Sequence, residues 1–169
     1  MFGRRREPNL AVDLLVGAAS GIFASWVMGK AQSRISKMGS SQARAAEKAA
    51  ADTEPATFKA AAMAVKPLGI RLTRAQRGVG GNIVHYAYGA AWGAVFAAAA
   101  RRSSLPIPLN GALFGIGLWF LSDELLVPLA GLSKKPTAYP ASTHLKALAA
   151  HVVYGTATAR AHHLLQKFA

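Results

Sequence analysis

The chain has 169 residues and no cysteine, which excludes disulfides, thiolate metal sites and a thiol nucleophile. Only 16% of the residues are charged and 52% are hydrophobic, whereas a soluble domain has about 25% charged residues. This composition favours a single membrane domain over the alternative, a soluble Ala-rich helical bundle. The net charge of +13 comes without a basic stripe interleaved with aromatics, so it predicts contact with anionic lipid headgroups and not with nucleic acid.

The first predicted element is a membrane-spanning helix over residues 10–29. Residues 14–29 contain no Asp, Glu, Lys or Arg, and about 17–25 mostly apolar residues are enough to span a bilayer. Three arginines at residues 4–6 precede this run, as in a signal peptide. Because no good small-x-small cleavage site lies before a soluble domain, and because more spans follow, we interpret the segment as an uncleaved first helix.

A long basic connection over residues 30–81 follows the first span. Its first part, 30–53, is rich in Ala, Ser and charge, and is expected to be helical or loosely ordered at the surface. After Pro55, residues 56–65 form a predicted amphipathic helix, and the glycine cluster at 78–81 is expected to end the connection. A short basic amphipathic segment beside a membrane usually lies on the headgroups; a docking surface for a partner protein is the alternative.

Three further spans are predicted over residues 82–100, 107–132 and 141–161, which makes four in all. The second span contains no Asp, Glu, Lys or Arg, and the third contains none before Asp123. The fourth is the least apolar, because two histidines and a lysine lie in it. The predicted fold is therefore an all-α membrane protein with four transmembrane helices in one domain.

The sequence also repeats itself in a fixed order. The run GAASGI at residues 17–22 recurs as GALFGI at 111–116, and HYAYG at 85–89 recurs as HVVYG at 151–155. This order predicts a duplicated helical hairpin, in which the first span pairs with the second and the third with the fourth. The two HxxYG motifs would then occupy equivalent places about a pseudo-twofold axis.

Small residues recur every four positions in all four spans. Such ridges let helix backbones approach closely, which drives helix association in lipid. The glycines predicted to pack the helices are Gly17, Gly21, Gly89, Gly93, Gly111, Gly115 and Gly155.

The HxxYG motifs supply the first polar candidates within the spans. Histidine and tyrosine three residues apart share one helix face, which places His85 with Tyr88 and His151 with Tyr154. Their simplest role is to hydrogen-bond across a helix pair. A proton- or ion-handling role is the second hypothesis, and a haem held by the two histidines is a third.

A second polar group lies where the third and fourth spans face each other. Asp123 and Glu124 lie in the second half of the third span, and His144 and Lys146 enter the fourth span from the same side. Charged groups at this depth are costly unless paired, so we expect a Glu124–Lys146 or an Asp123–His144 pair. The alternative is a wet cavity used in proton or solute movement.

Motifs of soluble enzymes do not occur in the chain. There is no phosphate-binding loop, no GxSxG elbow and no HExxH pair. We therefore expect no enzymatic activity, no metal and no cofactor. His162 and His163 are interpreted as a solvated helix end.

Three runs resemble the YagU-like family of small bacterial inner-membrane proteins. They are WFLSDE at residues 119–124, PLAGLS at 128–133 and AAHVVYG at 149–155. The resemblance implies an inner-membrane location, an N-terminus inside, and a loose association with acid tolerance. The excess of basic residues in 30–77 favours the opposite orientation by the positive-inside rule, so orientation stays open.

Two classes of function follow from the sequence. In the first, the protein has a structural or accessory role and binds lipid, a membrane protein partner or a second copy of itself. In the second, it is a small channel or carrier for protons or a small solute, and uses the His/Tyr pairs together with Asp123 and Glu124.

Overall fold

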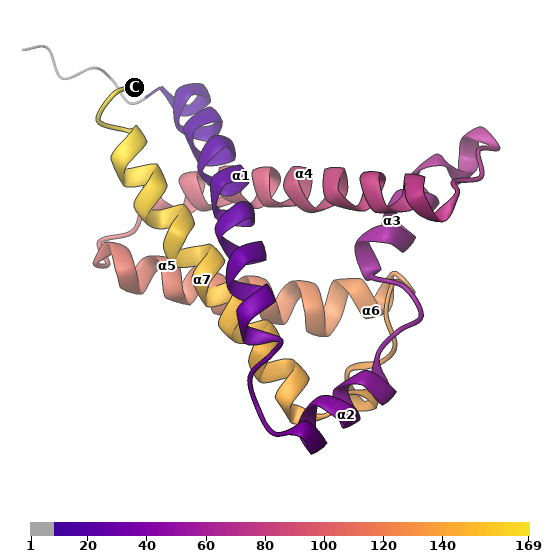
Figure 1. Cartoon of the computed structure of the whole chain (residues 1–169). Helices are drawn as coiled ribbons and strands as arrows, with labels where there is room; N and C mark the ends of the chain where they lie inside the picture. The colour runs from indigo at the N-terminus through magenta and orange to yellow at the C-terminus, as the bar shows by residue number, and fades with distance from the viewer. Residues whose placement is uncertain (1–8) are drawn as a thin grey trace, which may run out of the picture.

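The computed structural model of the chain describes residues 9–169, and in that range it contains helices and no strand. The expected all-α fold class is therefore confirmed, while the triple arginine at residues 4–6 lies outside the described residues. The helices are α1 (Leu10–Ile35), α2 (Ser41–Ala50), α3 (Ala56–Val65), α4 (Arg74–Ala100), α5 (Ile107–Trp119), α6 (Val127–Leu129) and α7 (Ala141–Leu165). Short 3₁₀ turns η1 (Lys66–Leu68) and η3 (Pro136–Ala138) and a π-helical segment η2 (Phe120–Leu126) complete the chain (Figure 1).

Three of these helices are long and apolar enough to cross a membrane. They are α1, α4, and the continuous helix Ile107–Leu129 formed by α5, η2 and α6. This indicates a membrane protein. The fourth predicted span, α7, has 25 residues but does not reach the apolarity of the other three, because its polar side chains lie along much of its length.

The helix α4 begins eight residues before the predicted start at residue 82. Thr73 and Gln76 form a capping box, in which each side chain bonds the other's backbone N–H and so satisfies donors that a helix start leaves unpaired. The glycine cluster at 78–81 then continues the helix. There, a Cβ on Gly80 would lie 2.8 Å from that of Ala61, and one on Gly81 would lie 2.6 Å from the Phe58 ring. These glycines therefore let α3 pack on α4.

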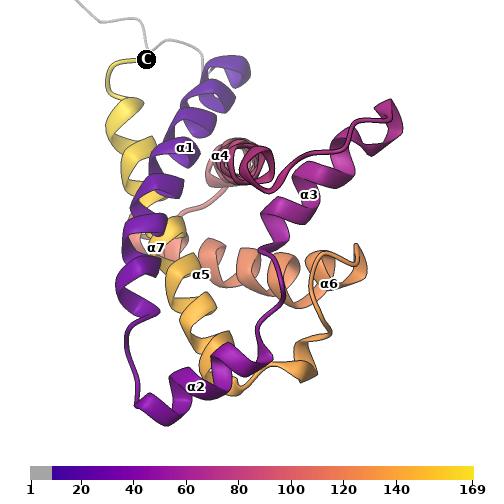
Figure 2. The same cartoon turned by 45° about the vertical axis from the view of Figure 1, so that its right-hand side comes forward.

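The long helices pack in a fixed set of pairs. α1 packs on α4, α5 packs on α7, and α1 also packs along α7, while α3 lies on α4. Figures 1 and 2 show α1 and α7 side by side, with α4 and α5 crossing them obliquely. The buried core lies where these pairs meet, around Ala24, Met28, Leu118, Ala150 and Tyr154.

The seven predicted packing glycines all lie at helix crossings. In the first crossing, a Cβ on Gly17 would lie 2.6 Å from the Cβ of Ala97, and one on Gly93 would lie 2.8 Å from the Cα of Gly21. Real Cβ atoms do not approach other atoms so closely, so no larger residue fits there without moving a backbone. In lipid, burying apolar side chains does not drive helices together, so the close van der Waals packing at these glycines stabilises the helix pair instead.

The second crossing repeats these contacts, but in a different register from the motifs. A Cβ on Gly111 would lie 2.9 Å from that of Ala159, and one on Gly155 would lie 2.9 Å from the Cα of Gly115. In its contacts Gly155 thus corresponds to Gly93, and not to Gly89 as the HxxYG alignment predicts. The predicted equivalence of the two motifs is wrong by one helical turn, about 6 Å along the axis.

The third predicted span contains a π-helical segment before Pro128. Proline has no N–H, so it cannot donate to the carbonyl four residues before it. In this segment the N–H of Val127 bonds to the carbonyl of Ser122, five residues back, and the backbone turn is wider. The helix ends at Leu129, three residues before the predicted end, and Gly131 turns the chain with a left-handed φ of 70°.

Candidate functional site

The tyrosine of the second HxxYG motif joins α7 to α4. Tyr154 is 2% exposed, and its hydroxyl donates a hydrogen bond of 2.6 Å to the carbonyl oxygen of Gly89. The same carbonyl oxygen also faces Gly21 of α1, where α1 and α4 cross. Tyr154 therefore links α7 to the place where α1 and α4 cross.

The first HxxYG motif has different partners. The hydroxyl of Tyr88 is hydrogen-bonded to that of Ser122 in η2, at 2.7 Å. Nε2 of His85 lies 3.3 Å from the carbonyl oxygen of Ser25 in α1. An axial haem ligand needs a free ring nitrogen, and the nitrogen of His85 that usually serves is engaged here, so the arrangement gives the haem hypothesis no support.

Two acidic residues of the third span, Asp123 and Glu124, pair with two of the histidines of α7. Nδ1 of His144 lies 2.6 Å from Oε1 of Glu124, and its Nε2 lies 3.1 Å from the carbonyl oxygen of Pro136. Nδ1 of His151 lies 2.9 Å from the carbonyl oxygen of Ala147 and 3.6 Å from Oδ2 of Asp123. Both pairs link η2 to α7.

The two pairs predicted from the sequence, Glu124–Lys146 and Asp123–His144, are not the pairs that form. His144 and His151 are seven residues apart and share a helix face, whereas Lys146 is two residues from His144 and points elsewhere. Nζ of Lys146 lies 2.7 Å from Oε2 of Glu47 in α2. The sequence predicts a helical or loosely ordered surface segment there, and the helix α2 forms, but nothing in the local pattern indicates Glu47 as a partner of Lys146.

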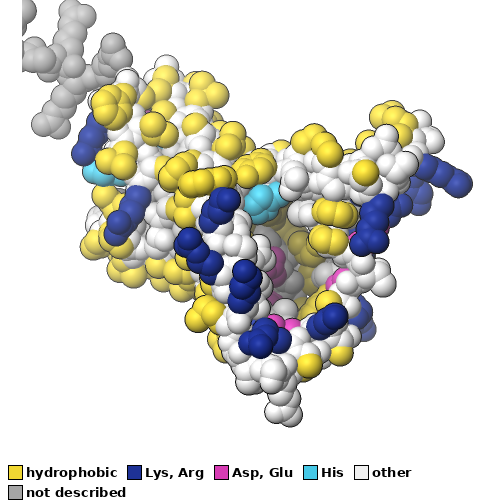
Figure 3. All heavy atoms as spheres, viewed as in Figure 1, with side chains coloured by type: hydrophobic (Ala, Val, Ile, Leu, Met, Phe, Trp, Pro, Cys, Tyr) yellow, Lys and Arg dark blue, Asp and Glu magenta, His cyan; other side chains and the backbone are white. Residues whose placement is uncertain are grey.

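A cavity of about 190 Å³ lies beside these pairs. Its polar lining includes Asp123, Glu124, Tyr139, Thr143 and His144. Figure 3 shows a hollow in this face of the molecule with acidic side chains inside it. Carboxylates paired with imidazoles can take up and release protons, or hold a small cation.

Asp52, which the sequence did not single out, fastens the long connection to the η3 turn. Its carboxylate accepts bonds from Nζ of Lys59 at 3.1 Å and from the hydroxyl of Tyr139. Lys134 adds a bond of 2.7 Å from its Nζ to the carbonyl oxygen of Ala50. Burial works to raise the pKa of Asp52, but the bonds from Tyr139 and Lys59 and the backbone N–H of Lys134 bring that pKa below its ordinary value.

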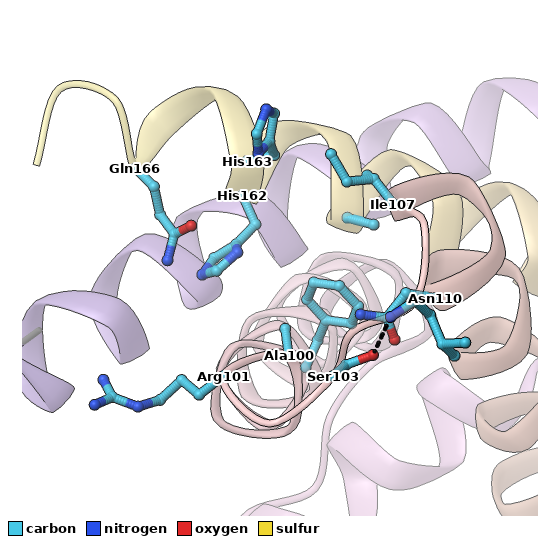
Figure 4. Close-up of a pocket in the computed structure, with 11 residues that line it drawn as sticks. Ala100, Arg101, Ser103, Ile107, Asn110, His162, His163 and Gln166 are labelled. Carbon is cyan, nitrogen blue, oxygen red and sulfur yellow. Dashed lines mark hydrogen bonds between the residues drawn. The ribbon is translucent and has the colours of Figure 1, made fainter.

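A second cavity lies at the opposite end of the molecule, near the C-terminus. It has a volume of about 230 Å³, and Figure 4 shows the ring of His162 directed toward it while His163 points away. His162 is 5% exposed and packs edge-on against Phe96. The interpretation of His162 as a solvated helix end is therefore wrong, because α4 covers this side of α7.

Between residues 9 and 169, no three His, Asp or Glu side chains lie close enough together to hold one metal ion.

The fold and the interhelical polar pairs indicate a helical membrane protein. No protein-family model, no curated protein and no solved structure matches this chain.

Proposed function

We propose that the protein is a small integral protein of the bacterial inner membrane, with a structural or accessory role. In this proposal α1, α4, the α5–α6 helix and α7 all cross the bilayer. The observation that carries the proposal is that the polar side chains of the candidate site bond to other helices, and not to an open channel. Tyr154 bonds to α4, Tyr88 to η2 and His144 to Glu124.

The same bonds support α7 as the fourth span. A helix with histidines, a lysine and a tyrosine is expensive in lipid unless those groups face protein partners. His151 and Tyr154 are buried, and Lys146 reaches Glu47. Lipid therefore need not meet the groups that lower the apolarity of α7.

The link to acid tolerance rests on the resemblance to the YagU-like family. An accessory protein of this kind would act by holding a partner in place, either another membrane protein or a second copy of the chain. Apolar side chains on the outer faces of α1 and α5 offer contact surface; Leu15 is 71% exposed and Leu113 is 48% exposed.

A second candidate function is a carrier for protons or a small solute. The observation in its favour is the Asp123–His151 pair, whose closest atoms are 3.6 Å apart. This is too long for a hydrogen bond, and Asp123 also lines the 190 Å³ cavity. Such a pair is free to exchange a proton with a ligand in that cavity.

One pair of variants separates the two functions. Asp123→Asn and His151→Gln are tested for thermal stability in detergent, for acid survival of cells, and for pH-driven flux in proteoliposomes. The structural proposal expects no flux from the wild type and a loss of acid survival that follows the loss of stability. If the wild type shows a pH-driven flux, and the variants stay folded but lose that flux, the structural proposal is wrong and the carrier function takes its place.

A further inference from the structure

Two apolar grooves flank one ridge on the first part of α4. The first groove lies between α3 and α4, has a volume of about 550 Å³, and is lined by residues that include Ala61, Val65, Leu72, Val79 and Ile83. The lining is almost free of polar atoms. It faces outward, and nothing in residues 9–169 fills it.

The second groove lies on the other side of the same ridge. It has a volume of about 480 Å³ and runs between α4 and Ile22 of α1, past Tyr86 and Ala90. Val79 and Ile83 line both grooves, and each is 64% exposed. Val79 and Ile83 thus form a ridge between two apolar grooves of similar size.

Three exposed cations lie at or just before the start of α4, on the N-terminal side of the ridge in the sequence. These are Lys66, Arg71 and Arg74, and among the described residues none of them has an acidic partner. The neighbouring Arg77 differs, because it bonds to Glu54 at 2.8 Å. Figure 3 shows Lys and Arg side chains gathered at this end of the molecule beside exposed apolar ones.

We propose that this surface binds an anionic phospholipid with two acyl chains. The phosphate would lie against Arg71, Arg74 and Lys66, and one acyl chain would occupy each groove. Arg74 precedes Val79 by five residues, about 7.5 Å along the helix, so the charged and apolar parts follow one another as they do in a lipid. The proposal rests on the proposed membrane location of the protein.

Charge distinguishes this occupant from the alternatives. Cations next to a membrane attract anionic headgroups, each by an amount equal to about a fivefold change in binding. A second copy of this chain, with its net charge of +13, would instead bring more positive charge to the same place. A zwitterionic lipid would leave the three cations without a net counter-charge.

The test uses purified protein in mild detergent, mixed with phosphatidylglycerol or phosphatidylcholine of identical acyl chains, with bound lipid counted by native mass spectrometry. We expect the wild type to retain phosphatidylglycerol selectively. The double variant Arg71→Gln/Arg74→Gln should bind it roughly thirtyfold more weakly. The matched control Arg102→Gln/Arg160→Gln removes two exposed arginines elsewhere and should bind like the wild type.

A further variant tests the grooves themselves. Ala64→Trp should fill the first groove and weaken lipid retention, while Ala98→Trp, on an exposed part of α4 outside both grooves, should not. Equal retention of the two lipids, equal losses in the arginine control, or no effect of Ala64→Trp would overturn the proposal. A protein that stays integral to the membrane but shows any of these results would leave the proposed function standing.

Discussion

The hydroxyl of Tyr154 in α7 lies 2.6 Å from the carbonyl oxygen of Gly89 in α4. Gly89 also lies against Ser25 of α1, whose hydroxyl donates to the carbonyl oxygen of Gly21 at 2.9 Å. Three long helices therefore meet at one glycine. The absence of a side chain at Gly89 lets α1 approach from one side while its carbonyl stays open to Tyr154 on the other.

Removing the Tyr154 hydroxyl tests this junction. Tyr154→Phe keeps the ring and loses one buried interhelical hydrogen bond, so we expect it to destabilise the fold by about 1 kcal/mol. Thermal unfolding in detergent measures the change. Tyr86→Phe is the control, since the Tyr86 hydroxyl makes no hydrogen bond to any of residues 9–169; equal losses for the two variants would contradict the assigned role.

Glycine-to-alanine changes test the crossings. At Gly93 and Gly155 a new methyl group meets backbone of the facing helix, and we expect destabilisation by about 1–3 kcal/mol. At Gly117 the added methyl group would have no atom of another helix within 4 Å among residues 9–169. There it should be neutral or stabilise by up to about 1 kcal/mol, because alanine restricts the unfolded chain more than glycine does. A uniform response at the three positions would show that the four-residue pattern is only compositional.

Acid should release the connection from the η3 turn. The pKa of Asp52 is below its ordinary value of 3.8, so its contribution is fully present above that value and disappears as the pH falls through the lower folded pKa. Residues 50–60 and 133–139 should therefore be protected from hydrogen exchange, relative to the unfolded chain at the same pH, above about pH 4 and should lose that protection below it. Asp52→Asn should make exchange fast even at neutral pH; unchanged protection in that variant would contradict the assignment.

Much of the helix pairing could be predicted from the sequence, because small residues four apart leave a readable ridge. The relative register of the two HxxYG motifs could not be predicted, because their tyrosines have different hydrogen-bond partners. Tyr88 bonds to Ser122, whereas Tyr154 bonds to Gly89. Identical short motifs do not specify which neighbour a long side chain meets.

Partners distant in sequence were the other failure. Glu47 and Asp52 lie in an Ala-rich segment, and their partners Lys146 and Tyr139 lie 99 and 87 residues away. Local periodicity carries no information about such pairs. The π-helical segment was also missed, although Pro128 supplies its physical cause.

In the proposed function α7 crosses the membrane, although it is the least apolar of the four long helices. The chain has no cysteine, so single cysteines at Gln42, Ser104, Ala138 and Lys167 can be labelled in intact cells or vesicles with an impermeant thiol reagent. We predict that positions 104 and 167 react from one side and positions 42 and 138 from the other. Labelling of positions 138 and 167 from the same side would contradict the four-span account.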